Sequence, residues 1–483
     1  MESLNGFFTF LNNYLWGPPM LILLVGTHLY LTFRLRFIQK HIGLAIKLSV
    51  TREDNTAGDV SPFGALTTAL AATIGTGNIV GVAIAVALGG PGAVLWMWLT
   101  GVFGIATKYS EALLAVKYRT TTSDGSMIGG PMFALEKGLK MKWLGVLFCV
   151  FTTLAAFGIG NTVQANAITS LVGETLEIPS YLTGLILAAL TALVILGGIK
   201  SIAQTCERLV PFMAAFYVIG CAVILLINLP FIVPAVVLIF KSAFTPRAAG
   251  GGFIAATIMT AARFGVARGL FSNESGLGSA PIVAAAARTK NPVRQALVSA
   301  TGTFWDTVVV CAMTGLVLVS SILKSPEKFE GLNGAALTKA VFAAVPVAGP
   351  LVLTIGLFTF TFSTILGWSY YGEKAFEYLF GKKFIKGYRI AWVLAVFVGS
   401  IATMPLVWNF ADALNALMAI PNLISVLCLS GVIVAETKKY LWDGSIEASE
   451  HIDIAPMDFI PEPQFATPVP EPKKVLASAE NQI

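Results

Sequence analysis

Charged residues are scarce in this sequence. Only 12% of the 483 residues are Asp, Glu, Lys or Arg, whereas 56% are hydrophobic, and the mean hydropathy is +0.78. A soluble globular protein carries about a quarter charged residues, so this composition has too little charge to build a water-exposed surface. The chain is therefore predicted to be an all-α polytopic membrane protein, surrounded by membrane lipid.

Cysteine is also sparse, and no CxxC pair occurs among the five cysteines, at positions 149, 206, 221, 311 and 428. This spacing argues against a disulfide framework and against a cysteine metal site. The N-terminal residues lack a basic region and a small-residue cleavage site, so no cleaved signal peptide is expected. The net charge of +6 is modest and, in a membrane protein, reports loop orientation rather than a nucleic-acid partner.

About eleven apolar stretches approach the length of roughly 20 residues that a membrane-spanning helix needs. They cover residues 16–33, 62–88, 92–114, 143–169, 181–198, 210–229, 250–270, 296–322, 350–372, 388–404 and 409–435. We expect one extra N-terminal helix and two five-helix repeats, over 62–229 and 250–435, with inverted topology because each repeat has an odd number of spans. Residues 230–247 contain three prolines and are predicted to form a re-entrant or surface hairpin.

Basic residues gather in the loops on one side of these spans, as in RLRFIQKHIGLAIK, ARTKNPVR and GKKFIKGYR. An excess of Lys and Arg marks the cytoplasmic side, so the N-terminus is expected outside the cell (inner or plasma) membrane and the C-terminus inside. Residues 1–440 are then the transmembrane domain. Residues 441–483 are polar and rich in proline and acid, and they are expected to be a disordered cytoplasmic tail.

The stretch ATIGTGNIVG, residues 72–81, places three glycines and one asparagine inside the second span. Its spacing is GxGxxxG within a membrane helix, whereas a dinucleotide-binding loop needs GxGxxG between a strand and a helix. Gly77 and Gly81 fit a GxxxG packing face. Packing alone does not explain Thr76 and Asn78, because a polar amide at bilayer depth is costly unless it has a partner.

A break in the helix accounts for the whole motif. Glycines weaken a helix, and unwinding frees carbonyl and N–H groups, which must line a protein cavity because lipid cannot satisfy them. The N–H groups suit a carboxylate, and the carbonyls suit a hard cation such as sodium. Transporters built from inverted repeats use this arrangement. The partner segment is expected within 250–270 and its continuation, where Arg263, Gly265, Arg268 and Gly269 interrupt the apolar run.

Other polar residues at membrane depth have two interpretations each. Gln164 either forms an interhelical hydrogen bond or contacts a polar ligand near Asn78. Ser363 and Thr364 either bond back to the preceding turn of their own helix or contribute hydroxyl oxygens to a sodium site. Trp368 lies one turn beyond Thr364, where it either walls a small pocket or packs at the helix surface.

Three long motifs resemble the alanine or glycine:cation symporters, also called the sodium:alanine symporter family. They are GTGNIVGVAIAVALGGPGAVLWMWLTGVFG (75–104), FSNESGLGSAPIVAAAA (271–287) and FSTILGWSYYGEKAFEYLFG (362–381), and the likeness covers about residues 1–440. The family is similar to the LeuT-type fold, with ten core helices and an extra one. The resemblance implies a transporter and not an enzyme, with sodium-coupled uptake of small neutral amino acids, chiefly alanine and glycine, and no organic cofactor. The oligomeric state stays open, and a monomer is compatible.

The resemblance also implies site residues. It assigns to the substrate Thr73, Gly75, Thr76, Gly77, Asn78, Gln164, Ile258, Met259, Phe264 and Trp368. It assigns to sodium the carbonyls of Ala71, Ile74 and Phe360 with the hydroxyls of Ser363 and Thr364. In this assignment the substrate carboxylate lies by residues 75–78, and Trp368 faces the substrate side chain.

One departure from the LeuT-type pattern concerns the outer gate. Such transporters often have an arginine one turn beyond the asparagine, paired with an acid, and here that position is Gly81. Asp412 is nevertheless a candidate for an outer gate, and Asp306 for ion coupling. The alternatives are a proton-coupled amino acid transporter with Asp306 as the proton carrier, and a channel or a sensor that binds amino acid without moving it.

Overall fold

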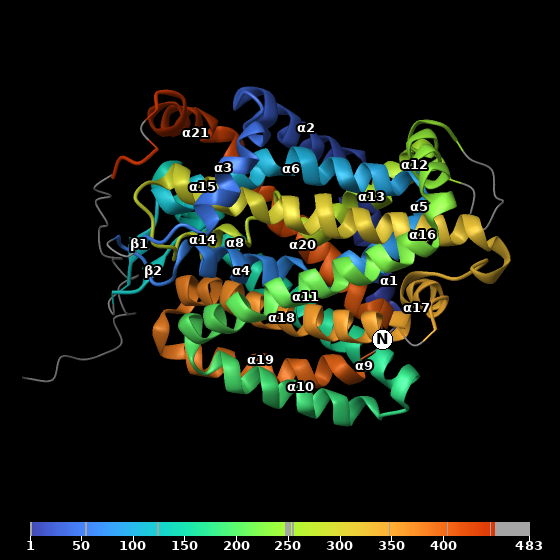
Figure 1. Ribbon diagram of the computed structural model, residues 1–483. Coiled ribbons are helices and arrows are strands. Elements are labelled where there is room, and N and C mark those ends of the chain that lie inside the picture. Colours follow the sequence, from blue (N-terminus) through green and yellow to red (C-terminus); the bar gives the residue numbers. More distant parts are fainter. Residues whose placement is uncertain are drawn as a thin grey trace, which may run out of the picture.

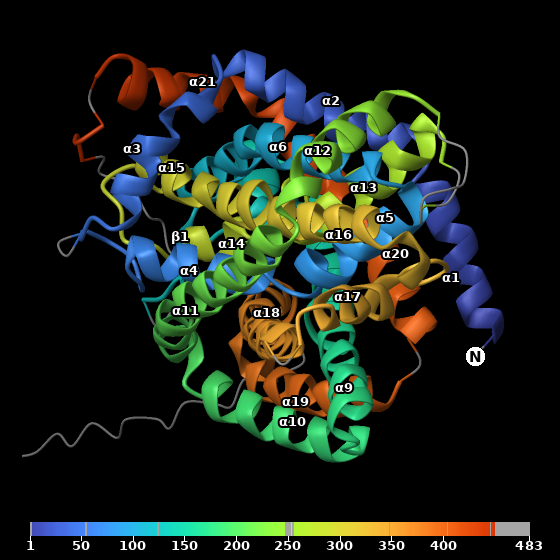
Figure 2. The same cartoon turned by 45° about the vertical axis from the view of Figure 1, so that its right-hand side comes forward.

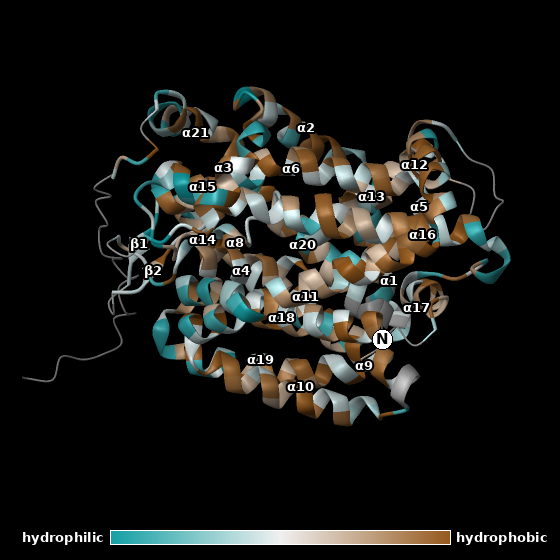
Figure 3. Ribbon diagram, in the orientation of Figure 1, coloured by the Kyte–Doolittle hydropathy of each residue, from teal (hydrophilic) through white to brown (hydrophobic). Residues whose placement is uncertain are grey.

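The computed structural model describes residues 2–53, 56–122, 125–246, 253, 256–346, 348–402, 404–444 and 446–449. Long helices lie side by side in one bundle (Figures 1 and 2). In this part of the chain, the only paired strands are short: β1 (Thr120–Thr121) pairs antiparallel with β2 (Met127–Ile128), with Thr120 opposite Ile128. Hydrophobic residues cover the middle of the bundle and hydrophilic residues gather toward its two ends, as in a membrane-spanning protein (Figure 3).

The helices follow one another with short connections, and several contain π-helical turns. Those of the first half are α1 (Glu2–Leu15), α2 (Pro18–Arg34), η1 (Ile38–His41), α3 (Ile42–Ser49), α4 (Pro62–Thr73), η2 (Gly77–Gly81), α5 (Val82–Gly89), α6 (Gly92–Lys117), α7 (Pro131–Phe133), η3 (Ala134–Gly138), α8 (Lys142–Ala155), η4 (Ala156–Thr162), α9 (Val163–Leu176), α10 (Ser180–Ile195), α11 (Gly198–Ile227) and α12 (Leu229–Phe244). Those of the second half are α13 (Ile258–Asn273), α14 (Pro281–Ala284), α15 (Pro292–Thr303), η5 (Phe304–Cys311), α16 (Ala312–Lys324), η6 (Pro326–Lys328), α17 (Gly334–Ala343), α18 (Ala348–Phe380), η7 (Lys382–Phe384), α19 (Ile385–Ile401), α20 (Met404–Cys428), α21 (Ser430–Thr437) and η8 (Lys438–Trp442).

Within the residues described, six helices are long and apolar enough to cross a membrane, and two bent helix pairs raise the number to eight. The bent pairs are α1 with α2, and α4 with the helix that η2 and α5 form together. The predicted spans 181–198 and 250–270 correspond to α10 and α13, which have 16 residues each. The predicted class, a mostly helical bundle with several apolar helices, is therefore confirmed, whereas eleven spans and the inverted repeat remain predictions.

Residues 230–247 do not form the predicted hairpin. Up to Phe244 they belong to a single helix, α12, with Pro230 in its first turn and Pro234 inside. Pro230 has no N–H, but N–H groups in the first turn of a helix have no intrahelical partner in any case. Pro234 removes one further hydrogen bond, and the helix continues beyond it because α12 packs on α6 and α16.

The predicted interruption of the second repeat at Arg263–Gly269 was also misplaced. Helix α13 is continuous through these residues, and part of the predicted span, 250–252 with 254 and 255, lies outside the described residues. Its two glycines serve close packing on α6 instead. A Cβ on Gly265 would lie 2.5 Å from the carbonyl oxygen of Ala93, and one on Gly269 would lie 2.2 Å from Oγ1 of Thr100.

Gly265→Ala is expected to force α13 away from α6, because the new Cβ meets backbone atoms that cannot move alone. Overpacking of this kind costs about 1–3 kcal/mol, measurable as a lower melting temperature of the purified protein. Gly43→Ala in α3 is the control, since nothing lies within 4 Å of its Cβ position. Equal melting temperatures of the two variants would contradict the close packing.

Candidate substrate and cation site

The predicted break in the second span is present between α4 and η2. The two helical parts are bent by 51°, and Ile74 between them has an extended backbone with ψ of 93°. Both parts are buried at the centre of the bundle. π-helical turns lie nearby in η4 and η5, and such turns are frequent at functional sites.

The break redirects two hydrogen bonds that a continuous helix would make. The N–H of Gly75 donates to Oδ1 of Asn78 at 2.9 Å, and not to the carbonyl of Ala71. The N–H of Asn78 donates to the carbonyl of Gly75 at 3.2 Å, and not to that of Ile74. The carbonyls of Ala71 and Ile74 are therefore released from the helical ladder at a depth where no bulk water can solvate them.

Five oxygens gather at the released carbonyls. Oγ1 of Thr364, on α18, lies 3.1 Å from the carbonyl oxygen of Ala71, 3.3 Å from that of Ile74 and 2.9 Å from that of Phe360. Oγ of Ser363 lies 3.3 Å from the Ala71 oxygen and 2.9 Å from the Phe360 oxygen. Each hydroxyl bonds back within α18, as the first interpretation expects, and also contacts a carbonyl freed at the end of α4, while the sodium site remains a prediction. Neutral oxygens of this kind suit a hard cation, so the five residues fit the sodium set that the family resemblance implies.

Gln164 reaches the other side of the same break. Its Oε1 accepts from the N–H of Thr76 at 3.2 Å, and its Nε2 donates to the carbonyl of Ile159 at 2.8 Å. A Cβ on Gly75 would lie 2.5 Å from Oγ1 of Thr364 and 3.1 Å from Oε1 of Gln164, so only glycine fits there. Oγ1 of Thr76 is buried and has no hydrogen-bond partner in the part of the chain that the structure describes.

Asp306 is the charged neighbour of Asn78. Nδ2 of Asn78 donates to Oδ1 of Asp306 at 2.7 Å. Ser272 and Thr307 donate their hydroxyls to Oδ2, at 2.9 and 2.6 Å. Three donors directed at one buried carboxylate fit its ionised form, which accepts hydrogen bonds and donates none.

Trp368 lies one turn beyond Thr364 on α18. It is fully buried and lies edge-on to Tyr371, with ring centroids 5.5 Å apart. A Cβ on Gly160, in η4, would lie 2.1 Å from Cβ of Trp368, so α18 and η4 touch there. Thr73 is buried at the end of α4, where its hydroxyl bonds back to Leu70 at 3.3 Å.

The remaining expected substrate residues lie elsewhere. Ile258 and Met259 begin α13 and are 38% and 56% exposed, and Phe264 lines a cavity together with Val80 and Ile84, beyond the first break. The structure does not bring these three residues together with Asn78. The expectation placed the second break within α13, whereas the chain leaves the helix only after Asn273.

The second break, residues 274–280, was missed by the sequence analysis. Gly276 and Gly278 have φ of 103° and 82° there. Both polar backbone groups of Gly276 are held by side chains: its N–H donates to Oε1 of Glu111 at 2.8 Å, and its carbonyl accepts from Nδ2 of Asn422 at 2.9 Å. A signal was available, because Gly276-x-Gly278 repeats the Gly75-x-Gly77 spacing.

The two breaks approach each other. A Cβ on Gly77 would lie 3.1 Å from the ring of Phe271 and 3.2 Å from Cα of Ser272, both near the end of α13. This contact also explains how Ser272 reaches Asp306. Residues on the two discontinuous helices therefore form one connected polar cluster in the middle of the bundle.

Above this cluster lies a cavity of about 740 Å³. Its lining comes mainly from α1, η2, α5, α13, α17 and α20, with residues such as Asn12, Val80, Phe264, Ala335 and Asp412. Arg268 forms an ion pair with Asp412 inside it. The guanidinium also lies 5.4 Å from the ring of Trp408, which stacks on Phe271.

Residues 1–453 match the model of the family described as "Sodium:alanine symporter family". The chain is 56% identical over 436 residues to the sodium/alanine symporter AgcS of Methanococcus maripaludis, covering 89% of this chain and 95% of that protein. It is 39% identical over 436 residues to the probable sodium/glutamine symporter GlnT of Bacillus subtilis, covering 89% of each. The crystal structure of MhsT in complex with L-phenylalanine has a TM-score of 0.55 at 15% identity, over 77% of this chain and 90% of that one, which is a likeness of fold.

Proposed function

The chain belongs to the sodium:alanine symporter family, and from this premise we propose that it moves alanine or glycine into the cell together with sodium, by alternating access. Family membership makes it a multi-pass membrane transporter for cation-coupled amino acid symport, and not an enzyme. One observation carries the finer proposal: carbonyls released by the break after α4 meet two hydroxyls of α18 in a cluster of five oxygens.

In this proposal sodium binds among those five oxygens. The hydroxyls of Ser363 and Thr364 would turn their protons away and direct lone pairs at the ion, which the three carbonyls also face. The ion would then join α4 to α18 in place of the hydroxyl-to-carbonyl hydrogen bonds. Sodium binding would thereby fix the first discontinuous helix against the rest of the bundle.

The substrate carboxylate is proposed to bind at the N–H groups of residues 75–77. The side-chain oxygens of Asn78 and Gln164 accept from two of these groups, those of Gly75 and Thr76, and they stand in for carboxylate oxygens. The site lies at the start of a helical segment, where an anion is favoured. In this proposal the Trp368 indole, which packs against Gly160, limits the substrate side chain to a small one and so favours alanine and glycine over larger amino acids.

One peptide group couples the two ligands in this scheme. The carbonyl of Ile74 faces the proposed cation and the N–H of Gly75, in the same peptide, faces the proposed carboxylate. A cation at the carbonyl polarises the peptide and strengthens its N–H as a donor. By linkage, alanine must raise the affinity for sodium by the same factor that sodium raises the affinity for alanine.

Alternating access is supported by the difference between the two sides of the site. The cavity of about 740 Å³ lies on one side, which the basic-loop rule makes the outer face. We assign the outer gate to Arg268 and Asp412. Position 81, where LeuT-type transporters often have the gate arginine, is a glycine in this chain. Arg268 of α13 would supply the guanidinium instead, because its Cδ lies 3.9 Å from where a Cβ on Gly81 would be.

Proton coupling through Asp306 is the second candidate. It requires that carboxylate to gain and lose a proton during transport, whereas three hydrogen-bond donors already surround its two oxygens. Sodium coupling needs no such change and uses oxygens that are already assembled. A channel or sensor would bind amino acid without accumulating it, which the following measurement separates.

Proteoliposomes with a sodium gradient and equal pH on both sides should accumulate alanine above its external concentration. The driving force is the gradient of sodium itself, so collapsing it should release the accumulated alanine. The measurement is uptake of labelled alanine, with a potassium gradient as the control. Uptake that is indifferent to sodium would rule out sodium symport, and uptake that stops at equal concentrations would point to a channel.

Asn78→Ala is expected to weaken alanine binding at least tenfold, about 1.4 kcal/mol. The variant loses the bond that Asn78 accepts from the N–H of Gly75 and the bond that it donates to Asp306, which together hold the break in the shape of the proposed carboxylate site. Binding isotherms for alanine, glycine and D-alanine, with and without sodium, provide the measurement. Asn166→Ala is the control, because it removes a buried amide that bonds Ala402 away from the site. Unchanged alanine affinity in Asn78→Ala would place the substrate elsewhere.

Ser363→Ala is expected to raise the sodium concentration for half-maximal alanine binding about tenfold, with little change in alanine affinity at saturating sodium. The variant removes one oxygen of the five, the one that faces Ala71 and Phe360. A sodium titration of alanine binding measures this. Ser369→Ala, which loses only a bond to the carbonyl of Leu366 in the same helix, should leave the titration unchanged. A sodium dependence shifted equally by both substitutions would argue against this cation site.

A further inference from the structure

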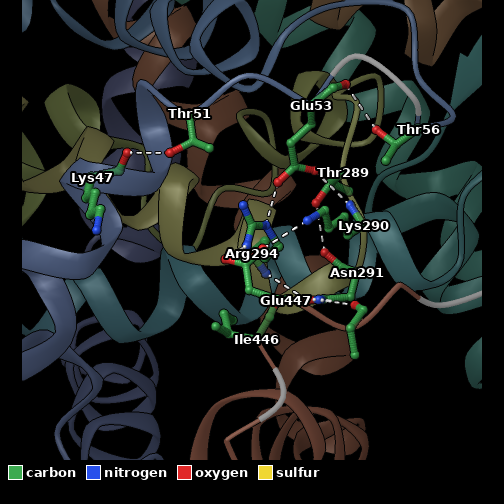
Figure 4. A network of polar contacts seen from close by, with 11 residues as sticks. Lys47, Thr51, Glu53, Thr56, Thr289, Lys290, Asn291, Arg294, Ile446 and Glu447 are labelled. Carbon is green, nitrogen blue, oxygen red and sulfur yellow. Dashed lines mark hydrogen bonds and ion pairs between the residues drawn. The ribbon is translucent and has the colours of Figure 1, made fainter.

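Residues 446–449 dock on the loop that joins α14 to α15 (Figure 4). Nδ2 of Asn291 donates to the carbonyls of Ile446 at 3.0 Å and Ala448 at 2.9 Å, on either side of Glu447. Oδ1 of the same Asn291 caps α15 by accepting from the N–H of Arg294 at 3.1 Å. The segment was expected to belong to a disordered tail, whose further residues, 450–483, lie outside the described part of the chain.

Glu447 adds two ion pairs to this docking. Its Oε1 lies 2.6 Å from Nη1 of Arg294, and its Oε2 lies 2.9 Å from Nζ of Lys290. These hydrogen bonds, from Lys290 and Arg294, hold the pKa of Glu447 below its usual range. The carboxylate is ionised at neutral pH, so the pairs are present under physiological conditions.

Arg294 also forms an ion pair with a second carboxylate, which is buried, unlike that of Glu447. It pairs with Glu53, which precedes α4, and Oε2 of Glu53 also accepts from the N–H of Lys290 at 2.8 Å. The side chain of Glu53 is 5% exposed, whereas that of Glu447 is 67% exposed. A buried pair is costly to break because it leaves an unpaired buried charge, while an exposed pair is weak and screened by salt.

The loops that meet at Arg294 belong to the two discontinuous helices. The loop before α4 pairs with the loop after α14 through Val60 and Ala287. The N–H groups of Asp59 and Val60 donate to the carbonyl of Ala286, at 2.8 and 3.2 Å, and the N–H of Arg288 donates to that of Val60 at 2.9 Å. Any opening on the cytoplasmic side of the site must separate these two loops.

We propose that residues 446–449 are a releasable strap on the surface formed by Lys290, Asn291 and Arg294, and that the docked strap holds the two loops together and slows opening of the cytoplasmic side. The strap orients the Arg294 guanidinium toward Glu53 and restrains the loop after α14. Its only charged side chain is the exposed carboxylate of Glu447, so it detaches far more easily than Glu53 does. The effect on transport rests on the proposed function, whereas the effect on the loops does not.

The test is Glu447→Gln in the full-length protein, measured by hydrogen exchange of the backbone amides in residues 56–60 and 286–290. We expect exchange about threefold faster in the variant, as befits the loss of exposed ion pairs. Raising the salt concentration from about 0.02 to 0.5 M should speed exchange in the wild type by screening the same pairs, and should leave the variant nearly unchanged. Glu330→Gln, an exposed acid on the outer side, is the matched control.

Equal exchange in the wild type and Glu447→Gln would overturn the strap. The initial rate of sodium-driven alanine uptake should also rise about threefold in this variant, with alanine affinity in saturating sodium unchanged. Faster exchange without faster uptake, in vesicles where the wild type transports alanine, would overturn the role in opening. Absence of uptake in every protein, the wild type included, would count against the proposed function, while hydrogen exchange still decides whether the strap holds the loops.

Discussion

The peptide group between Ile74 and Gly75 is the constraint from which the arrangement of the site follows. Its carbonyl faces the oxygens of α18 and its N–H faces Asn78, so the helix cannot continue through it. Gly75 must lack a side chain because Thr364 fills that space. Asn78 must then supply the acceptor that Ala71 would have supplied in an intact helix. Each residue of the motif has a role once this peptide leaves the helical ladder.

A broken helix inside a membrane is tolerated only if other parts of the protein satisfy its polar groups. At the first break, α18 and α9 supply the hydroxyl of Thr364 and the amide of Gln164. At the second break, α6 and α20 supply Glu111 and Asn422, which hold both backbone groups of Gly276. Side chains of the intact helices thus form hydrogen bonds with the backbone groups that the breaks leave free. This explains why polar residues occur along helices that are otherwise apolar.

The first break could be predicted from sequence because its signal is local: Gly75, Gly77 and Asn78 lie within four residues of one another. The five-oxygen cluster followed from a family resemblance, and its oxygens come from segments almost 300 residues apart. The roles of other residues depend on contacts between segments that are distant in the sequence. Gly265 could be a breaker or a packing residue, and only its contact with α6 distinguishes the two. Glu111 could not be assigned to Gly276 because 165 residues separate them.

The two sides of the site are closed by interactions of different strength. At one end, a single ion pair between Arg268 and Asp412, with side chains 10% and 14% exposed, lies within a cavity. At the opposite end, backbone pairing between Val60 and Ala287 is added to the buried pair of Glu53 with Arg294. Separating the loops at this second end would expose several hydrogen bonds and strip a buried carboxylate of its partner, which is the costlier change. In the function proposed above, ligand binding would have to offset this larger cost before the loops at that end separate.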